Sequence, residues 1–153
     1  MKGEKRNTTG ESYKPSIIGF ICNWGAYSGA EMAGIEQLEY PASLRLIRLP
    51  CLGRLHLGIL LKAFEKGADG VMMLGCPLAE CHYESGMARA KELHAEARKV
   101  LRLLGIDPRR LDLAEVPVGR GDILAGKVLA FARRINQRRL EQISVMKDAS
   151  RLV

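Results

Sequence analysis

The strongest constraint on the fold is a repeated alternation between short, almost wholly apolar segments and longer amphipathic segments. The short segments are typical of strands that are buried on both faces, and the longer ones carry apolar residues at helical spacing. Taken in order, they read strand, helix, strand, helix, strand, helix, strand, helix. Because such an alternation forms parallel sheets, we predict an α/β fold, Rossmann- or flavodoxin-like, with about four parallel strands flanked by helices.

The individual elements are predicted from the apolar runs and the residues that interrupt them. Strands are expected at 16–22, 44–49, 70–74 and 111–116, and helices at 28–38, 55–66, 87–104 and from about 123 to 139 or beyond. Gly67 and Gly105 stand where the second and third helices are expected to end. We therefore expect one domain at 16–140, preceded by a flexible polar arm at 1–15 and followed by a tail at 141–153 in which a helix is compatible with the sequence.

The composition is that of an ordinary soluble protein, with 47% hydrophobic and 27% charged residues in a chain of 153. No apolar run approaches the roughly 20 residues that a membrane-spanning helix needs. The best candidate for a leader segment, 17–26, is interrupted by two glycines and an asparagine and has no clear cleavage site. We predict no signal peptide, no membrane insertion, and a cytoplasmic location where thiols stay reduced.

The chain is basic, with a net charge of +7 and a sequence pI near 9.5. Nucleic-acid binding is nevertheless not predicted, because only 5% of the residues are aromatic and no helix-turn-helix, zinc-finger or RNA-binding signature is present. The basic residues are spread over the predicted helices and are enriched at 133–139. A solvated face, or a docking surface for an acidic partner, accounts for them better.

The four cysteines stand at or just beyond the ends of predicted strands. Cys22, Cys51 and Cys76 follow the first three strands, and Cys81 lies in the loop before the long third helix. The carboxyl ends of parallel strands share one edge of a sheet, and neighbouring strands lie only about 4.8 Å apart. The thiols are therefore expected to converge at the edge where such sheets bind their ligands.

Several kinds of site are compatible with four thiols in these positions. Separate buried cysteines behave as small hydrophobes, which explains each one but not their common position. Disulfides are disfavoured in a reducing compartment, and structural zinc commonly uses Cys-x2-Cys pairs, which this sequence lacks. Four thiolates also hold a 2Fe-2S cluster. A catalytic thiol is suggested only by Cys81 beside His82, and adjacent side chains generally point apart. The spacing alone leaves a metal or cluster site and isolated buried thiols equally open.

A flavin- or nucleotide-binding module that uses the same strand-end crevice is a further alternative. The glycines near the predicted strand ends do not form the G-x-G-x-x-G pattern of a dinucleotide site. We therefore predict no dinucleotide site of that kind, despite the order of the elements.

Three longer motifs occur in a specific order: IIGFICNWGAYSGAEMAG, then RLIRLPCLGR, then GADGVMMLGCPLAECHYESG. In order and spacing they resemble the delta subunit family of methyl-viologen-reducing hydrogenases, from about residue 17 to residue 105 and more weakly beyond. Members of this family are small iron–sulfur proteins. In methanogens and some bacteria they connect a hydrogenase or formate dehydrogenase to a heterodisulfide reductase.

The sequence departs from that family pattern at one important position. The pattern usually has a Cys-x2-Cys pair in the first motif, Pro-Cys in the second and Gly-Cys-x4-Cys-His in the third. Here Gly25 replaces the second cysteine of the pair, and Pro-Leu-Ala-Glu stands where His-Pro-Gly-Asp is common. Four cysteines are left, the number that a 2Fe-2S cluster requires. The resemblance therefore implies one such cluster, with its iron ligated by Cys22, Cys51, Cys76 and Cys81.

The function implied by the resemblance is electron transfer by a non-catalytic subunit of an oxidoreductase complex. It would relay electrons between a hydrogenase or formate-dehydrogenase-type donor and a heterodisulfide-reductase-like complex, whose flavin-containing subunit is the implied partner. Near the cluster, Trp24 either shields it from water or packs in the core. His82 either donates a hydrogen bond to a cluster sulfur or lies on the surface. The alternative is a cluster-free structural or assembly subunit of the same type of complex.

Overall fold

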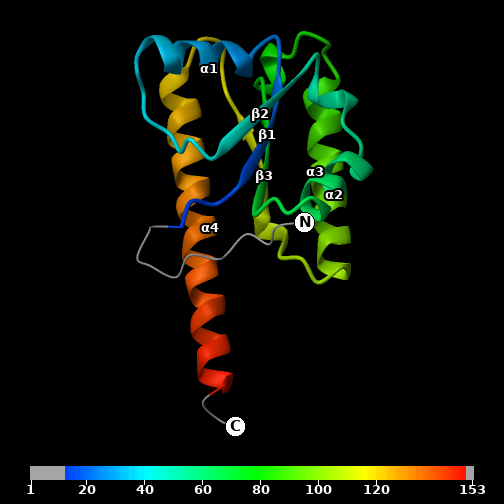
Figure 1. Ribbon diagram of the computed structural model, residues 1–153. Coiled ribbons are helices and arrows are strands. Elements are labelled where there is room, and N and C mark those ends of the chain that lie inside the picture. The colour runs from blue at the N-terminus through cyan, green and yellow to red at the C-terminus, as the bar shows by residue number, and fades with distance from the viewer. Residues whose placement is uncertain (1–12, 151–153) are drawn as a thin grey trace, which may run out of the picture.

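The four short apolar segments form a single parallel sheet in the computed structural model, which describes residues 13–150 (Figure 1). The strands are β1 (Ile17–Cys22), β2 (Leu44–Leu49), β3 (Gly70–Gly75) and β4 (Leu111–Glu115). They pair in the order β2-β1-β3-β4, with every pair parallel. This is the strand order of the first four strands of a flavodoxin-like sheet. The predicted α/β fold is confirmed.

Helices cover both faces of the sheet, as a sheet buried on both sides requires. They are α1 (Ala26–Ile35), α2 (Leu57–Glu65), α3 (Gly86–Leu103) and α4 (Gly121–Ser150). The first and last pack together on one face, and α2 and α3 lie on the other (Figure 1). Three short 3₁₀ turns, at Leu52–Arg54, Leu78–Glu80 and Pro108–Arg110, complete the connections. The predicted bounds differ from these by no more than three residues, except at the end of α4.

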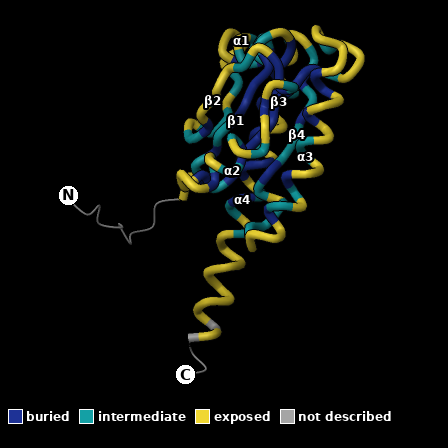
Figure 2. Tube along the Cα trace, turned by 90° about the vertical axis from the view of Figure 1, so that its right-hand side faces the viewer, coloured by how far each residue is buried: buried dark blue, intermediate teal, exposed yellow. Residues whose placement is uncertain are grey.

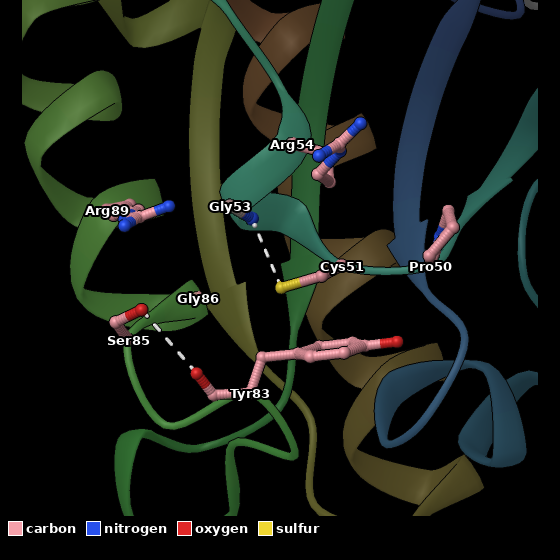
Figure 3. Close-up of a pocket in the computed structure, with 8 residues that line it drawn as sticks. All are labelled: Pro50, Cys51, Gly53, Arg54, Tyr83, Ser85, Gly86 and Arg89. Atoms are coloured by element: carbon pink, nitrogen blue, oxygen red, sulfur yellow. Dashed lines mark hydrogen bonds between the residues drawn. The ribbon is translucent and has the colours of Figure 1, made fainter.

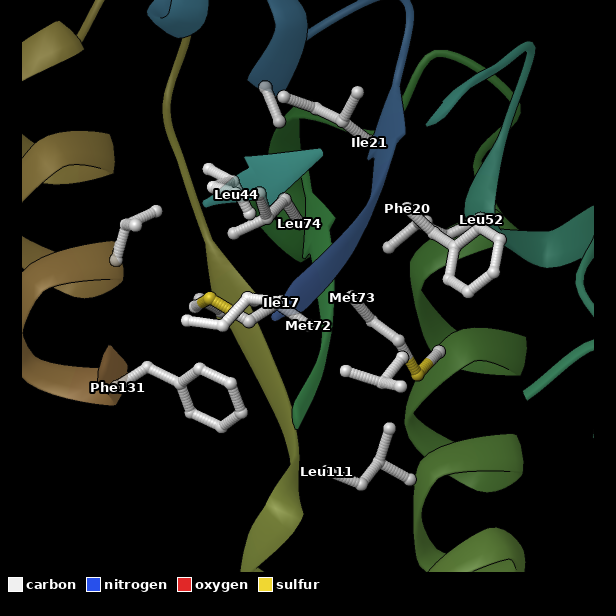
Figure 4. Packing of buried hydrophobic residues seen from close by; sticks show 14 of the residues in the cluster. Ile17, Phe20, Ile21, Leu44, Leu52, Met72, Met73, Leu74, Leu111 and Phe131 are labelled. Atoms are coloured by element: carbon white, nitrogen blue, oxygen red, sulfur yellow. The ribbon is translucent and has the colours of Figure 1, made fainter. Parts of the chain in front are cut away.

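The burial of each strand follows from its place in the sheet. All six residues of β3 are buried, because this strand lies between β1 and β4 and under helices on both faces. The edge strand β2 is mostly exposed or half-buried, which explains why its apolar alternation is interrupted by Arg45 and Arg48. Figure 4 shows the two layers of the core, with Phe131 of α4 on one side of the sheet and Met73 on the side of α3.

The end of α4 projects beyond the sheet, on the side away from the carboxyl ends of the strands (Figures 1 and 2). The helix that was expected to run from about 123 to 139 or beyond continues unbroken to Ser150, so it includes most of the tail at 141–153. Its apolar residues beyond 139 are largely exposed, Leu140 at 68% and Met146 at 72%. Most of the expected N-terminal arm, residues 1–12, lies outside the described part of the chain, as do residues 151–153. Within the described part, no helix combines the length and the apolar character needed to cross a membrane.

Candidate functional site

Three adjacent strands deliver cysteines to the same edge of the sheet. Cys22 is the last residue of β1, Cys51 lies two residues beyond β2, and Cys76 directly follows β3. Because β1 pairs with both β2 and β3, these three strand ends are neighbours. The fourth thiol, Cys81, is supplied by the loop between the 3₁₀ turn Leu78–Glu80 and α3.

The four thiols contact one another as a single group. The Cys76 thiol lies within interaction range of the sulfurs of Cys81 and Cys22, and the Cys51 thiol lies within range of Cys81. A Cβ atom added at Gly86 would lie only 2.2 Å from the Cys51 Sγ and 3.2 Å from the Cys81 Sγ. The structure thus brings together all four cysteines that the strand ends were expected to gather. No disulfide joins these cysteines.

The four thiols differ in burial, and this affects their pKa values. Cys22, Cys51 and Cys76 are buried, and Cys81 is half-buried. Burial raises the pKa of Cys76 to about 12, and the charges of the Cys22 and Cys81 thiolates raise it further. Burial also raises the pKa of Cys51, with the same two neighbours adding to the effect. The group therefore resists carrying several negative charges unless a positive centre neutralises them.

Cys81 differs because it faces the first turn of α3. Burial alone would raise its pKa, but hydrogen bonds donated by the backbone N–H groups of Met87 and Tyr83, by the Cys76 thiol and by the Gly86 N–H hold it below its usual value. The Gly53 N–H donates a similar bond to the Cys51 Sγ at 3.3 Å. Such N–H to sulfur bonds stabilise thiolates and tune iron–sulfur centres.

The thiols do not form a ready-made site for one metal ion. Among residues 13–150, no three His, Cys, Asp or Glu side chains are arranged to hold a single ion. A single zinc ion would need its thiolates at about 2.3 Å from one common point. The small hollow between the sulfurs, lined by Cys22, Cys51, Cys76 and Met87 among others, is too tight to admit a water molecule. The candidate ligand atoms are all sulfurs, and they are tightly packed.

Three aromatic side chains from the loops after Cys22 and Cys81 lie together. Trp24 stacks on His82, with ring centroids 4.0 Å apart and an interplanar angle of 17°, and Tyr83 meets the His82 ring edge-on. The Trp24 Nε1–H donates to the Tyr83 hydroxyl at 3.1 Å. We call these three residues the aromatic lid. The lid ties the loop after Cys22 to the loop after Cys81.

The positions of Trp24 and His82 bear on their predicted roles. Trp24 is 49% exposed, so it does not pack in the core. The contacts of His82 in the described structure are with the rings of Trp24 and Tyr83, and none is with a thiol. Neither Asn23 nor Ser28 is the N-cap of α1, because that position is taken by Gly25, which has no side chain to make a capping bond.

Close backbone packing around the thiols was missed by the sequence patterns. A Cβ at Gly25 would lie 2.6 Å from the Cys76 Cβ, and one at Gly53 would lie 2.9 Å from the Gly86 Cα. These glycines therefore allow three loops to meet where a side chain would hold them apart. Gly86 immediately precedes the predicted third helix, and that was the only signal of its role in the sequence.

A pocket of about 380 Å³ adjoins the thiols on the side of Cys51 (Figure 3). It is lined by Pro50, Cys51, Gly53, Arg54, Tyr83, Ser85, Gly86 and Arg89. Tyr83 therefore belongs both to the aromatic lid and to this pocket.

Comparison with known proteins gives consistent matches. The family model described as "Methyl-viologen-reducing hydrogenase, delta subunit" matches residues 17–138. The vhu iron-sulfur subunit of the F420-non-reducing hydrogenase of Methanocaldococcus jannaschii is 37% identical over 123 residues, which cover 80% of this chain and 92% of that protein. The vhc iron-sulfur subunit of the F420-non-reducing hydrogenase of Methanococcus voltae is 42% identical over 101 residues, covering 66% of this chain and 70% of that protein.

A longer relative matches over the same domain. It is a subunit of the ferredoxin:CoB-CoM heterodisulfide reductase of Methanosarcina mazei, and it is 31% identical over 130 residues, which cover 85% of this chain. The chain spans only 16% of the length of that protein. A domain similar to this one is therefore part of a much larger polypeptide in that organism.

Proposed function

This chain belongs to the family of methyl-viologen-reducing hydrogenase delta subunits, as its three motifs suggested, and we propose that it is an electron-transfer subunit carrying one 2Fe-2S cluster. The proposed ligands are Cys22, Cys51, Cys76 and Cys81. The single observation that carries the proposal is the meeting of these four thiols, from three strand ends and one loop, at one edge of the sheet.

The residues present suit such a cluster chemically. Two irons bridged by two sulfides take four thiolates, which is the whole cysteine content of the chain. When bound, the cluster supplies a carrier for one electron at a time. The positive iron would relieve the mutual repulsion that keeps the pKa values of Cys51 and Cys76 high. The N–H groups that point at the Cys51 and Cys81 sulfurs would steady both ligands.

The chain's own residues also set how the site meets its surroundings. Three thiols are buried, and the aromatic lid joins the loops that follow Cys22 and Cys81. Cys81 is only half-buried, so the site lies close to the surface. A shallow site suits electron exchange with a centre in a neighbouring subunit.

The proposed position is between a hydrogenase or formate-dehydrogenase-type donor and a heterodisulfide-reductase-like complex. Relatives named as iron-sulfur subunits of hydrogenases support the first association, and the relative named as a heterodisulfide reductase subunit supports the second. In the latter, a domain like this one is covalently joined to the rest of a longer polypeptide. We therefore propose the flavin-containing subunit of such a complex as the direct partner.

A cluster-free structural subunit is the second candidate, favoured by one observation. The packing at the sulfurs is tight, with Gly25 backed against Cys76 and no room for water in the hollow. Iron and acid-labile sulfide analysis after anaerobic purification separates the two candidates. A cluster requires about two irons and two sulfides per chain. Less than about one iron per chain after reconstitution would exclude the cluster and leave the structural role. Co-purifying flavin absorbance would instead support a flavin-binding module.

Exchanging Gly25 and Cys76 tests whether the departure from the family pattern is harmless. The double variant Gly25→Cys/Cys76→Gly removes the Cβ that a side chain at position 25 would strike, and it returns a thiol to the same neighbourhood. We expect it to keep more than about half of the wild-type iron, since four thiolates are still present. The matched control Gly25→Ala/Cys76→Gly has the same packing change without the thiol and should bind little iron. Equal iron in the two variants would show that position 25 cannot supply a ligand.

Removing the Trp24 ring should make the cluster less durable without preventing its assembly. Trp24→Ala breaks a stacked pair worth about 0.5–1.5 kcal/mol and frees the loop that carries Cys81. Freshly reconstituted protein should hold its full iron, but the visible absorbance should decay several-fold faster in aerated buffer. Trp24→Phe, which can still stack on His82 but cannot donate to Tyr83, should decay at an intermediate rate. Decay of the alanine variant at the wild-type rate would exclude a shielding role for the lid.

A further inference from the structure

The pocket beside Cys51 is formed by two segments that the cysteine site brings together. One is the turn after β2, with Pro50 and Arg54, and the other is the loop and first turn of α3, with Tyr83 and Arg89. Figure 3 shows the Cys51 side chain pointing from the first segment toward the second, with Arg54 and Arg89 above its sulfur in this view and the Tyr83 ring below. We call this cavity the arginine pocket.

The arginine pocket carries two positive charges that the chain does not neutralise. Within residues 13–150, neither Arg54 nor Arg89 makes an ion pair or a side-chain hydrogen bond. Other arginines of this chain do pair with carboxylates, as Arg120 does with Asp122 and Arg134 with Asp112. No acidic side chain lines the pocket. Two free guanidinium groups on one cavity favour a carboxylate from outside, because each can donate paired hydrogen bonds to it.

The rim of the arginine pocket has the composition of a protein-binding surface. Tyr83 and its hydrogen-bonded neighbour Trp24 are each 49% exposed, and Pro50 adds an apolar wall. Tryptophan, tyrosine and arginine are the residues that most often dominate binding energy in protein interfaces. Aromatic surface beside unpaired arginine therefore indicates a protein partner with an acidic segment.

The basic stretch near the C-terminus does not serve this edge of the molecule. It lies on α4, whose free end points away from the strand ends that carry the cysteines (Figure 1). Two of its arginines are also occupied, since Arg134 pairs with Asp112 and Arg138 with Asp107. Arg54 and Arg89, in contrast, line the same pocket as Cys51, so their unpaired charge lies at this edge.

We propose that the arginine pocket is the docking site for an acidic segment of the redox partner, whose Asp or Glu carboxylate lies between Arg54 and Arg89. The partner surface then covers the aromatic lid and comes directly against Cys51. The choice of the flavin-containing subunit as that partner rests on the proposed function, whereas the chemistry of the pocket does not. Complementary charge of this kind orients two proteins as they meet and raises their association rate.

The test measures binding of the reconstituted full chain to the purified flavin-containing heterodisulfide reductase subunit from the same organism, by biolayer interferometry at low and physiological salt. Arg54→Gln and Arg89→Gln should each raise Kd by about three- to tenfold, and the double variant by more than about tenfold. The dependence of Kd on salt should become shallower in the double variant. Arg102→Gln, on the exposed far end of α3, is the matched control and should stay within about twofold of wild type.

A conservative pair separates charge from structure. Arg54→Lys/Arg89→Lys keeps both charges but loses the paired hydrogen bonds, so it should recover part of the affinity that the glutamine double variant loses, which a purely structural role of the guanidinium groups would not produce. Binding is interpreted only for variants whose far-UV circular dichroism spectrum is the same as that of the wild type, which shows that they are folded. Wild-type affinity in the glutamine double variant would overturn the proposal, and so would a wild-type chain that does not bind the flavin-containing subunit.

Failure of the docking site and failure of the proposed function give different results. Iron is measured on the same samples used for binding. If binding depends on the two arginines but the chain holds no iron, the docking site is supported and the electron-transfer role is excluded. If the chain holds its full cluster but binding does not depend on the arginines, the docking site is excluded and the electron-transfer role is supported.

Discussion

A Cys51→Ser variant should lose the 2Fe-2S cluster almost completely. The chain has four cysteines, and a cluster held by thiolates alone needs all of them, so no spare thiol can take over. Cys51 also interacts with Cys22 and Cys81, and its sulfur accepts the Gly53 N–H. Iron should fall from about two to well below one per chain, with loss of the visible absorbance.

The same result is expected for Cys22→Ser, Cys76→Ser and Cys81→Ser, each measured after anaerobic reconstitution. Serine is close to cysteine in size, so the far-UV circular dichroism spectrum should stay that of the wild type, which separates loss of iron from loss of fold. Ser85→Ala, in the loop after Cys81, is the control and should keep its iron, because its hydroxyl makes only a 3.5 Å contact to the Tyr83 carbonyl. A normal cluster spectrum from Cys51→Ser would show that the ligand set is wrong.

The convergence of the cysteines was predictable because it follows from topology. Once the alternation of strands and helices indicates a parallel sheet, every strand end must lie at one edge. Cys22, Cys51 and Cys76 stand at such ends in the sequence itself. Only the strand order was missing, and the observed order places the three strands side by side.

The covering of the thiols was not predictable, because it depends on loops that meet across long stretches of sequence. Trp24 and Tyr83 are joined by a hydrogen bond although 59 positions separate them. The arginine pocket joins the turn after β2 to the start of α3 in the same way. The periodicity of apolar residues does not predict such contacts, because loop conformation is set by the packing of a few side chains and glycines.

The sequence left the end of α4 open for a different reason. Up to Ile135 its buried residues follow the helical period, because they pack on the sheet and on α1. Past that point the helix leaves the sheet, and the apolar period that reveals a helix is lost. Five of the eleven residues of 140–150 are the good helix formers Leu140, Glu141, Met146, Lys147 and Ala149, which favour the helix where its packing on the sheet has ended.

A Gly86→Ala variant should disrupt the cysteine group from the backbone side. The added Cβ would lie 2.2 Å from the Cys51 Sγ and 3.2 Å from the Cys81 Sγ, so at least one sulfur must move. Alanine is otherwise favoured in a helix by about 0.5–1 kcal/mol, so any loss comes from this contact. We expect the free energy of unfolding of the iron-free chain to fall by about 1–3 kcal/mol, the usual cost of overpacking.

Iron binding by Gly86→Ala reports on the same contact in the presence of the cluster. If the four sulfurs ligate one cluster, displacing Cys51 or Cys81 should reduce the iron retained after reconstitution to less than about half of the two per chain. Gly126→Ala is the matched control, because Gly126 lies in α4 with no atom within 4 Å of the added Cβ. That variant should keep its iron and gain stability in urea unfolding. Loss of stability in Gly86→Ala with full iron binding would mean that Gly86 packs against the thiols without governing the ligands, and wild-type values for both would contradict the close approach itself.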